Sequence, residues 1–209
     1  MTAVVDYGVG NLSSLLGSLG HIGEEAVVTA DPAVLLSADR IILPGVGAFG
    51  DAADRLFSSG LAEVLCEAVG RGTPLLGICL GMQLLFERSL EYGEHRGLGL
   101  IRGEIRPISE GGAFPYKVPH MGWNSLKIRR RSALMRYVED GAYVYYVHSF
   151  CARGCDEAVD ATSDYGTEIV GAVSFGNVYG TQFHPEKSGS VGLSMLRAFC
   201  EIEKNGDSI

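Results

Sequence analysis

The sequence has no uninterrupted apolar run long enough to cross a bilayer, and its amino terminus lacks the basic lead and the small-residue cleavage site of a secretory signal. These two absences argue against a membrane or secreted protein and favour a cytoplasmic one. Nothing in the length of 209 residues requires a second core, and no repeat, linker or low-complexity tract divides the chain. We therefore predict a single domain over residues 1–209.

The chain also lacks paired cysteine spacings and an excess of positive charge. Its five cysteines form an odd set in which only CARGC at 151–155 brings two close together, and that spacing is a poor zinc half-site. We expect reduced thiols, no metal and no cofactor. A formal net charge of −8 disfavours a surface that neutralises many phosphates. Neither nucleic acid nor a membrane is an expected partner.

Short apolar runs alternate with helical patterns up to about residue 90, which predicts an α/β fold with parallel strands joined by crossover helices. The expected strands are 3–6, 26–29, 40–43 and 74–79, and the expected helices are 11–19, 31–36, 48–57 and 61–69. Later strands follow one another closely, which predicts antiparallel or mixed sheet. They are 99–107, 117–128, 142–148, 157–162, 169–175 and 178–183, before a last helix over 190–204.

A lone cysteine stands between two glycines in GICLG at 77–81, at the end of an expected strand. A sharp turn from strand to helix favours glycine there, because neighbouring backbone approaches closely while the central side chain points outward. Cys79 would then face the positive end of the following helix, which favours the thiolate form. This pattern makes Cys79 a candidate nucleophile. The alternative is a small buried hydrophobic residue.

A nucleophile needs a base, and HPE at 184–186 offers one. His184 follows an apolar strand, and Glu186 lies two positions later on the same side of an extended chain, where its carboxylate can turn towards the imidazole. Each could be an ordinary surface group when considered alone. Together with Cys79 they provide the nucleophile, base and orienting acid of covalent catalysis.

A glycine-rich loop, PGVG at 44–47, lies between an expected strand and an expected helix. Neighbouring parallel strands would bring it to the same sheet edge as Cys79, where its backbone N–H groups could join that of Leu80 in stabilising an oxyanion. Dinucleotide binding is an alternative for glycine loops. Ser13 stands where the third glycine of a G-x-G-x-x-G pattern starting at Gly8 should be. Ordinary turns are the remaining alternative.

The combination of GICLG with His184 and Glu186 resembles the catalytic triad of class I glutamine amidotransferases. Essentially end to end, the chain is similar to the family of glutaminase subunits of imidazole glycerol phosphate synthase. The matching segments are DYGVGN at 6–11, PGVGAF at 44–49, KVPHMGWN at 117–124, VHSF at 147–150 and HPEKSG at 184–189. The resemblance implies a three-layer, flavodoxin-like α/β sandwich with a central, mostly parallel and partly mixed sheet.

The resemblance also implies an activity. Cys79 would attack the carboxamide of glutamine, with His184 moving protons and Glu186 orienting it, and a thioester would hydrolyse to glutamate. Ammonia would pass to a (β/α)8-barrel cyclase subunit, as a heterodimer that makes imidazole glycerol phosphate and aminoimidazole carboxamide ribotide in histidine biosynthesis. In this family the glutaminase is nearly silent until the liganded cyclase binds. A peptide that rotates in the 44–47 loop is our hypothesis for that dependence.

Further roles are implied by the same resemblance. Gly47 and Leu80 would form the oxyanion hole, and glutamine would be held by Gly45, Val46, Gln83, His148, Ser149 and Phe150. The cyclase would be contacted by Tyr7, Asn11, Met121, Trp123, Tyr143, Tyr145 and Lys187, the last through an ion pair. Tyr143 and Tyr145 share one strand face, so an aromatic interface is physically reasonable. Core packing is the alternative for the tyrosines.

The sequence departs from the family's pattern at Cys151, where relatives commonly carry an aromatic residue, and the segment 151–157 is short and polar. The local structure of the glutamine-facing edge therefore does not follow from the resemblance. Three other functions are alternatives: a paralogous subunit that feeds ammonia to a sugar-modifying synthetase, a non-catalytic binding subunit, and a thiol hydrolase or peptidase of similar fold. The intact set of Cys79, His184 and Glu186 argues against the second.

Overall fold

The computed structural model describes residues 1–110 and 114–204, and the rest of the predicted domain 1–209 lies outside the described part. Its centre is an eight-stranded sheet with the order β2-β1-β3-β4-β14-β13-β12-β9. The five strands from β2 to β14 are parallel, and the other three are added antiparallel. The bounds are Thr2–Val5 (β1), Ala26–Thr29 (β2), Arg40–Leu43 (β3), Leu75–Ile78 (β4), Lys127–Ile128 (β9), Val159–Asp164 (β12), Glu168–Phe175 (β13) and Val178–Thr181 (β14).

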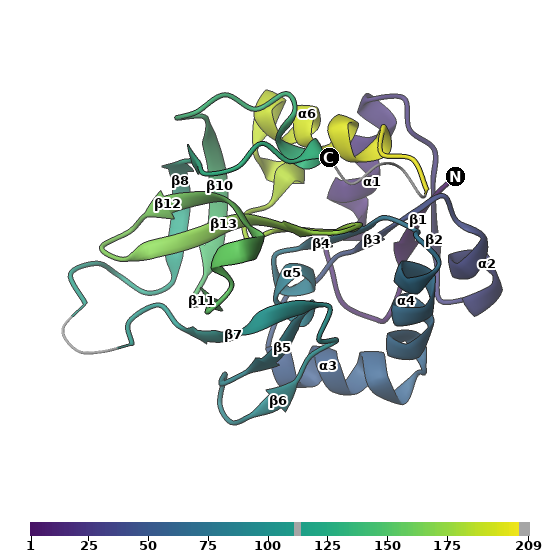
Figure 1. Cartoon of the computed structure of the whole chain (residues 1–209), viewed down its shortest axis with the longest axis horizontal. Helices are drawn as coiled ribbons and strands as arrows, with labels where there is room; N and C mark the ends of the chain where they lie inside the picture. Colours follow the sequence, from purple (N-terminus) through teal and green to yellow (C-terminus); the bar gives the residue numbers. More distant parts are fainter. Residues whose placement is uncertain (111–113, 205–209) are drawn as a thin grey trace.

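Helices cover both faces of this sheet (Figure 1). One face carries α1 (Leu12–His21) and α6 (Gly189–Cys200), and the other carries α2 (Pro32–Ser37), α3 (Phe49–Ser58) and α4 (Leu61–Gly70). A short helix, α5 (Leu80–Leu84), follows β4 directly. The predicted α/β fold, with a mostly parallel and partly mixed sheet between helical layers, is confirmed.

The strand sequences explain why both faces are covered. Strands β1 and β3 are almost continuously apolar, and successive side chains of a strand point to opposite faces. Val4 and Ile42 therefore pack in the cluster that contains α1 and α6, whereas Ala3 and Ile41 pack in the cluster that contains α3 and α4. The sheet separates two hydrophobic cores.

Two smaller sheets complete the structure. One has the order β11-β7-β5-β6, and in the other β8 pairs antiparallel with β10. The bounds are Phe86–Ser89 (β5), His95–Arg96 (β6), Ile101–Pro107 (β7), His120–Ser125 (β8), Tyr143–His148 (β10) and Phe150–Arg153 (β11). The pair β8 and β10 is called the β8–β10 ribbon below.

Each helix and strand predicted before residue 80 occurs within two residues of its expected bounds. Three short strands, β5, β6 and β11, were not predicted. The resemblance left the structure around Cys151 open: this residue is fully buried on β11, an edge strand that pairs with β7, and it packs in the same hydrophobic cluster as Tyr146. The last helix ends at Cys200, short of the expected residue 204.

Strands β3, β4 and β14 are consecutive neighbours in the sheet, and they run parallel. Their carboxyl ends consequently meet at one edge, which is where parallel sheets place ligand sites. The loop 44–47 follows β3, Cys79 follows β4, and His184 lies shortly after β14. Within the residues that the structure describes, no helix is long and apolar enough to cross a membrane.

Candidate active site

Cys79 occupies a strained turn between β4 and α5. Its backbone has φ 54° and ψ −107°, a combination that non-glycine residues rarely adopt and that persists only where the surroundings hold it. The Cys79 N–H donates to the Thr181 carbonyl at 2.7 Å, and the Gln83 N–H donates to the Cys79 carbonyl at 3.1 Å. These two hydrogen bonds attach the turn to β14, its neighbour in the sheet, and to the first turn of α5.

The glycines on either side of Cys79 are sterically required. A Cβ on Gly81 would lie 1.8 Å from the Leu43 carbonyl oxygen, and a Cβ on Gly77 would lie 2.6 Å from the backbone of Gly81. Both distances are far below van der Waals contact. The sequence argument for a tight strand-to-helix turn at 77–81 is therefore met by the observed backbone.

His184 and Glu186 lie together beside this turn. His184 Nδ1 is 2.7 Å from Glu186 Oε1, and the two side chains are only 3% and 4% exposed. The His184 N–H donates to the Tyr145 carbonyl at 3.0 Å, and the Ser188 hydroxyl donates to the His184 carbonyl at 2.6 Å. His184 Nε2 and Glu186 Oε2 are buried without a hydrogen-bond partner among the described residues. The contact with Glu186 thus orients Nδ1 of His184, while Nε2 remains available to a thiol or a substrate.

Charge around His184 favours its protonated form. Burial by itself lowers the pKa of the imidazole, but interactions with Cys79 and Glu186 outweigh burial and raise that pKa to about 9. An imidazolium held between a thiolate and a carboxylate is the arrangement that activates a cysteine nucleophile.

This raised pKa predicts how stability changes with pH. An unfolded histidine has a pKa of about 6.5, so the folded chain binds the extra proton up to pH about 9. The stabilising contribution is complete below pH about 6.5 and is lost as the pH rises through about 9. In Glu186→Gln the carboxylate is absent and this dependence weakens. We expect the difference in unfolding temperature between wild type and Glu186→Gln to narrow from pH 6.5 to roughly pH 9.5.

A matched control for this measurement is Glu67→Gln, which removes a carboxylate from an exposed ion pair with Arg71. Its difference from wild type should stay small and nearly constant over the same pH range. A difference for Glu186→Gln that is equally constant would contradict the assignment of the raised pKa to this pair.

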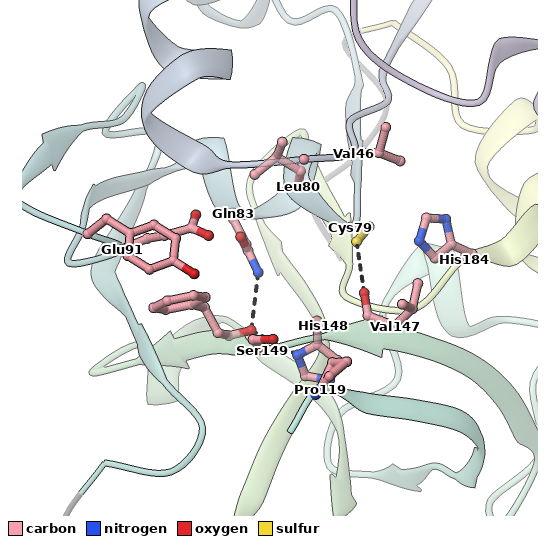
Figure 2. Close-up of a pocket in the computed structure, with 13 residues that line it drawn as sticks. Val46, Cys79, Leu80, Gln83, Glu91, Pro119, Val147, His148, Ser149 and His184 are labelled. Atoms are coloured by element: carbon pink, nitrogen blue, oxygen red, sulfur yellow. Dashed lines mark hydrogen bonds between the residues drawn. The ribbon is translucent and has the colours of Figure 1, made fainter. Parts of the chain in front are cut away.

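Cys79 and His184 open into one pocket of about 340 Å³ (Figure 2). In this view the Cys79 sulfur lies between the Gln83 side chain and the His184 ring. The lining residues are Val46, Gly47, Cys79, Leu80, Gln83, Glu91, Tyr92, Pro119, Val147, His148, Ser149, Phe150 and His184. The pocket thus contains both predicted oxyanion residues and every predicted glutamine-binding residue except Gly45. Glu186 lies behind His184, outside the pocket lining.

Gly45 differs from the prediction because it packs against protein and does not line the pocket. A Cβ there would lie 2.7 Å from the Tyr7 hydroxyl and 2.9 Å from the Gly81 nitrogen, so the loop approaches α5 too closely for a side chain. The next residues do reach the pocket: Val46 is 43% exposed, and Gly47 has φ +101°, a conformation that favours glycine. Gly45 therefore lets the loop approach, and Val46 and Gly47 face the cavity.

Two glutamine side chains connect the pocket wall to Cys79. Gln83 Nε2 donates to the Phe150 carbonyl at 3.1 Å and to Gln182 Oε1 at 3.0 Å, and Gln182 Nε2 lies 3.8 Å from the Cys79 sulfur. A backbone carbonyl can only accept, so the Phe150 contact fixes both amide orientations. Gln182 consequently presents an N–H to the thiol, which stabilises negative charge on sulfur.

Six of the seven predicted interface residues are at least partly exposed. Met121, Trp123 and Tyr143 are 61%, 56% and 60% exposed, which excludes core packing for Tyr143. On the β8–β10 ribbon Tyr145 pairs with Trp123, and their rings meet edge to face at 6.0 Å. Lys187 Nζ lies 6.0 Å from the centre of the Tyr145 ring. Asn11 is partly exposed and Lys187 exposed.

Tyr7 is the exception among the predicted interface residues. It is buried, with 7% of its surface exposed, and its hydroxyl donates to the Pro44 carbonyl at 2.7 Å. The prediction of a direct partner contact is therefore not supported by its position. The Tyr7 side chain instead packs against Gly45 and binds the Pro44 carbonyl, so it holds the loop 44–47 in place.

The sequence did not single out Gln182, Glu91, Tyr92, Val147 and Pro119. Glu91 is only 9% exposed, and its Oε2 accepts from the Phe49 N–H at the start of α3 at 2.7 Å. Burial raises the Glu91 pKa, and the hydrogen bond from Phe49 opposes that rise. No group of three His, Cys, Asp or Glu side chains in residues 1–110 and 114–204 could hold a metal ion.

Comparisons with known proteins identify relatives. The family model described as glutamine amidotransferase class-I matches residues 3–202. A protein named imidazole glycerol phosphate synthase subunit HisH from Wolinella succinogenes is 50% identical over 208 residues, which are 97% of this chain and 100% of that protein. A protein of the same name from Bacillus cereus is 51% identical over 199 residues, covering 95% and 93% of the two chains.

Solved structures show the same fold at lower identity. A glutamine amidotransferase crystal structure has a TM-score of 0.74 at 20% identity and covers 95% of this chain and 97% of that one. The structure of PurLQS from Thermotoga maritima has a TM-score of 0.71 at 22% identity and covers 95% and 96%. With the family model across nearly the whole chain and half of all residues shared with its relatives, this chain belongs to the class-I glutamine amidotransferase family, and within it to the imidazole glycerol phosphate synthase subunit HisH family.

Proposed function

We propose that this chain hydrolyses glutamine through a thioester on Cys79 and delivers the ammonia to a (β/α)8-barrel cyclase subunit in histidine biosynthesis. The observation that carries the proposal is the shared pocket, in which a cysteine on a strained turn and a buried, carboxylate-paired histidine face the same cavity. The names of the relatives, which call them subunits of imidazole glycerol phosphate synthase, support the choice of pathway and partner.

The reaction would proceed in two halves. The Cys79 thiolate attacks the side-chain carbonyl carbon of glutamine, and the oxygen takes up the negative charge. When the tetrahedral intermediate collapses, the C–N bond breaks, the His184 imidazolium gives its proton to the leaving nitrogen, and ammonia departs from a thioester. Neutral His184 then removes a proton from water, which attacks the thioester carbon and releases glutamate and the thiolate. Glu186 holds the imidazole by its Nδ1–H throughout.

The developing oxyanion would be stabilised by backbone N–H groups. Leu80 begins α5 directly after Cys79, and Gly47 lines the pocket from the loop after β3. Gly47 has no side chain, so both its observed positive φ and a negative φ are accessible, and the peptide between Val46 and Gly47 can rotate at low cost. A rotation that turns its N–H into or out of the pocket is the hypothesis for activation by the partner, and equal glutaminase rates with and without the liganded partner would count against it.

Glutamine would be held along the far wall of the pocket. Gln83 turns its amide nitrogen to protein acceptors, so its oxygen is available to a substrate N–H. Glu91 supplies a buried carboxylate for the α-ammonium group, and an ammonium beside it would keep the carboxylate ionised. Backbone at Ser149 and Phe150 would bind the α-carboxylate.

The cyclase would dock on the exposed side of the β8–β10 ribbon. Met121, Trp123 and Tyr143 form an exposed apolar and aromatic surface, which is the composition of interface hot spots. Lys187 comes directly after Glu186 and is exposed, so a cross-interface ion pair there would reach the catalytic segment.

The test is glutamate release from glutamine by the purified chain, alone and with a cognate barrel cyclase and its phosphorylated ligand. We expect a low rate alone and an increase of at least about 100-fold in the full mixture, the coupling of about 3 kcal/mol that allosteric partners reach. No glutaminase activity in a complex that forms would contradict the proposal. Activity only with a sugar-modifying synthetase, or on peptides without glutamine, would favour the corresponding alternative.

A further inference from the structure

His120 and His148 form a buried pair that takes no part in the proposed proton transfers, and His148 lines the pocket. They are 2% and 6% exposed, and His120 Nδ1 lies 2.9 Å from His148 Nε2. The two residues are directly paired across the β8–β10 ribbon. The His120 ring stacks on Tyr146 and Tyr165, with ring centres 4.6 Å and 3.9 Å apart. The mutual hydrogen bond and the stacking on the two tyrosines therefore fix the positions of the rings.

The neighbours of the pair determine which ring nitrogens carry protons. His148 Nδ1 is 2.8 Å from the Phe150 carbonyl, which can only accept, so Nδ1 of His148 must donate. At the other end, Asn124 Nδ2 donates to the Asp164 carbonyl at 2.9 Å, which fixes the amide, and the same nitrogen lies 3.3 Å from His120 Nε2. His120 Nε2 consequently accepts, and its Nδ1–H donates to His148 Nε2.

This series of hydrogen bonds, from Asn124 to Phe150, requires both imidazole rings to be neutral. Burial lowers the pKa of His148 to about 3 and that of His120 to about 4, so neither ring is protonated near neutral pH. Hydrogen bonds then run in one direction from Asn124 through His120 and His148 to the carbonyl of Phe150. The opposite tautomer of His148 would place a nitrogen lone pair against that carbonyl oxygen.

The series of hydrogen bonds ends on the Phe150 carbonyl oxygen, which also orients the Gln83 amide. The Phe150 carbonyl accepts from His148 Nδ1 and from Gln83 Nε2, so both of its lone pairs are used. The dashed line from Gln83 in Figure 2 marks this hydrogen bond, and it ends beside Ser149, with the His148 ring below. Displacement of the carbonyl would free the Gln83 amide to turn, and its oxygen would no longer face the pocket.

We propose that His120 and His148 are positioning residues for substrate binding, because as two neutral Nδ1–H tautomers in series they hold the Phe150 carbonyl and thereby the orientation of the Gln83 amide. The inference rests on the proposed function, in which glutamine occupies this pocket. His148 acts directly on the carbonyl, and His120 acts by keeping His148 in the required tautomer.

Two substitutions of His148 separate this role from simple packing. In His148→Asn the amide nitrogen takes the place of Nδ1 and can still donate to Phe150, whereas in His148→Gln it takes the place of Nε2 and cannot. In the activated complex we expect His148→Gln to raise the KM for glutamine about 10-fold, the effect of one lost buried hydrogen bond, with kcat changed less than about 3-fold. His148→Asn should keep KM within about 3-fold of wild type. As a control, thermal unfolding of each variant would be measured to check that both variants fold.

The tautomers are read independently by 15N NMR of the imidazoles in the free chain near pH 7. We expect both rings neutral with the proton on Nδ1, and His120→Leu should shift the His148 signals towards a mixture of tautomers. An Nε2–H or doubly protonated His148 in wild type would overturn the proposal, and so would equal KM values for the Asn and Gln variants. If wild type hydrolyses no glutamine with any partner, the proposed function fails, while the NMR result still decides the tautomers.

Discussion

Replacement of Cys79 by alanine is expected to reduce glutamine hydrolysis by at least about 10³-fold, because the variant has no atom that can form the thioester. The measurement is glutamate release in the mixture with the liganded cyclase, where we expect the wild type to be active. Since the alanine side chain fits the space of a small buried residue, the variant should keep the wild-type unfolding temperature to within a few degrees. Loss of rate without loss of fold separates chemistry from packing.

Cys66→Ala is the matched control for this substitution. Cys66 is half-buried on α4, and burial raises the pKa of its thiol, so it is a poor nucleophile outside the pocket. Its alanine variant should retain the wild-type rate. A glutamine analogue with an electrophilic carbon in place of the carboxamide should label Cys79 alone, as detected by peptide mass. Residual turnover by Cys79→Ala near the wild-type level would refute the assignment of the nucleophile.

Gly81→Ala is expected to cost about 3 kcal/mol or more of stability, because the new methyl group would lie 1.8 Å from the Leu43 carbonyl oxygen. For a domain of this size that corresponds to a fall of roughly 6–12 °C in unfolding temperature. Relief of the clash would push α5 away from β3 and move the Leu80 N–H, so glutamine hydrolysis should fall even below the unfolding temperature. Thermal unfolding and glutamate release together measure the two effects.

Gly17→Ala is the comparison for that experiment. Gly17 lies on the exposed side of α1, and a Cβ there meets nothing within 4 Å. Alanine in an exposed helix should stabilise by up to about 1 kcal/mol. If both glycine variants had the same unfolding temperature, the close approach of the loop after β3 to α5 would not exist in solution.

The turn around Cys79 and the pair of His184 and Glu186 could be predicted from the sequence because each is a local pattern. The sequence argument placed Glu186 on an extended chain after His184, whereas the structure has it in a 3-10 helix, Pro185–Lys187, which brings its carboxylate to His184 Nδ1. A period of two counted back from His184 would also have selected Gln182. Glu91 offered no such signal. It follows a short strand, β5, that pairs with distant residues, and its place in the pocket depends on that pairing.

Tertiary contacts also explain the features that residue patterns left open. The structure around Cys151 did not follow from the resemblance, because its burial depends on the pairing of β11 with β7, which the polar residues after it do not indicate. Tyr7 belongs to a motif shared with relatives, but the motif does not state that its hydroxyl is taken up by the Pro44 carbonyl. A pattern of residue types cannot distinguish an exposed aromatic from one that supports a loop from beneath.

The pocket lies where three sheets that share no strand meet, and Phe150 of β11 represents the four-stranded one. Cys79 and His184 belong to the ends of β4 and β14, whereas Val147 and His148 belong to the β8–β10 ribbon. Hydrogen bonds join the two sides without a shared strand: the His184 N–H donates to the Tyr145 carbonyl, and the Tyr145 N–H donates to the Ser188 hydroxyl. Residues on the two sides also pack in one hydrophobic cluster, which contains Val144 and Tyr146 of the ribbon together with Cys79 and Phe183. The width of the pocket is consequently set by how the ribbon packs against the main sheet, and not by either sheet alone.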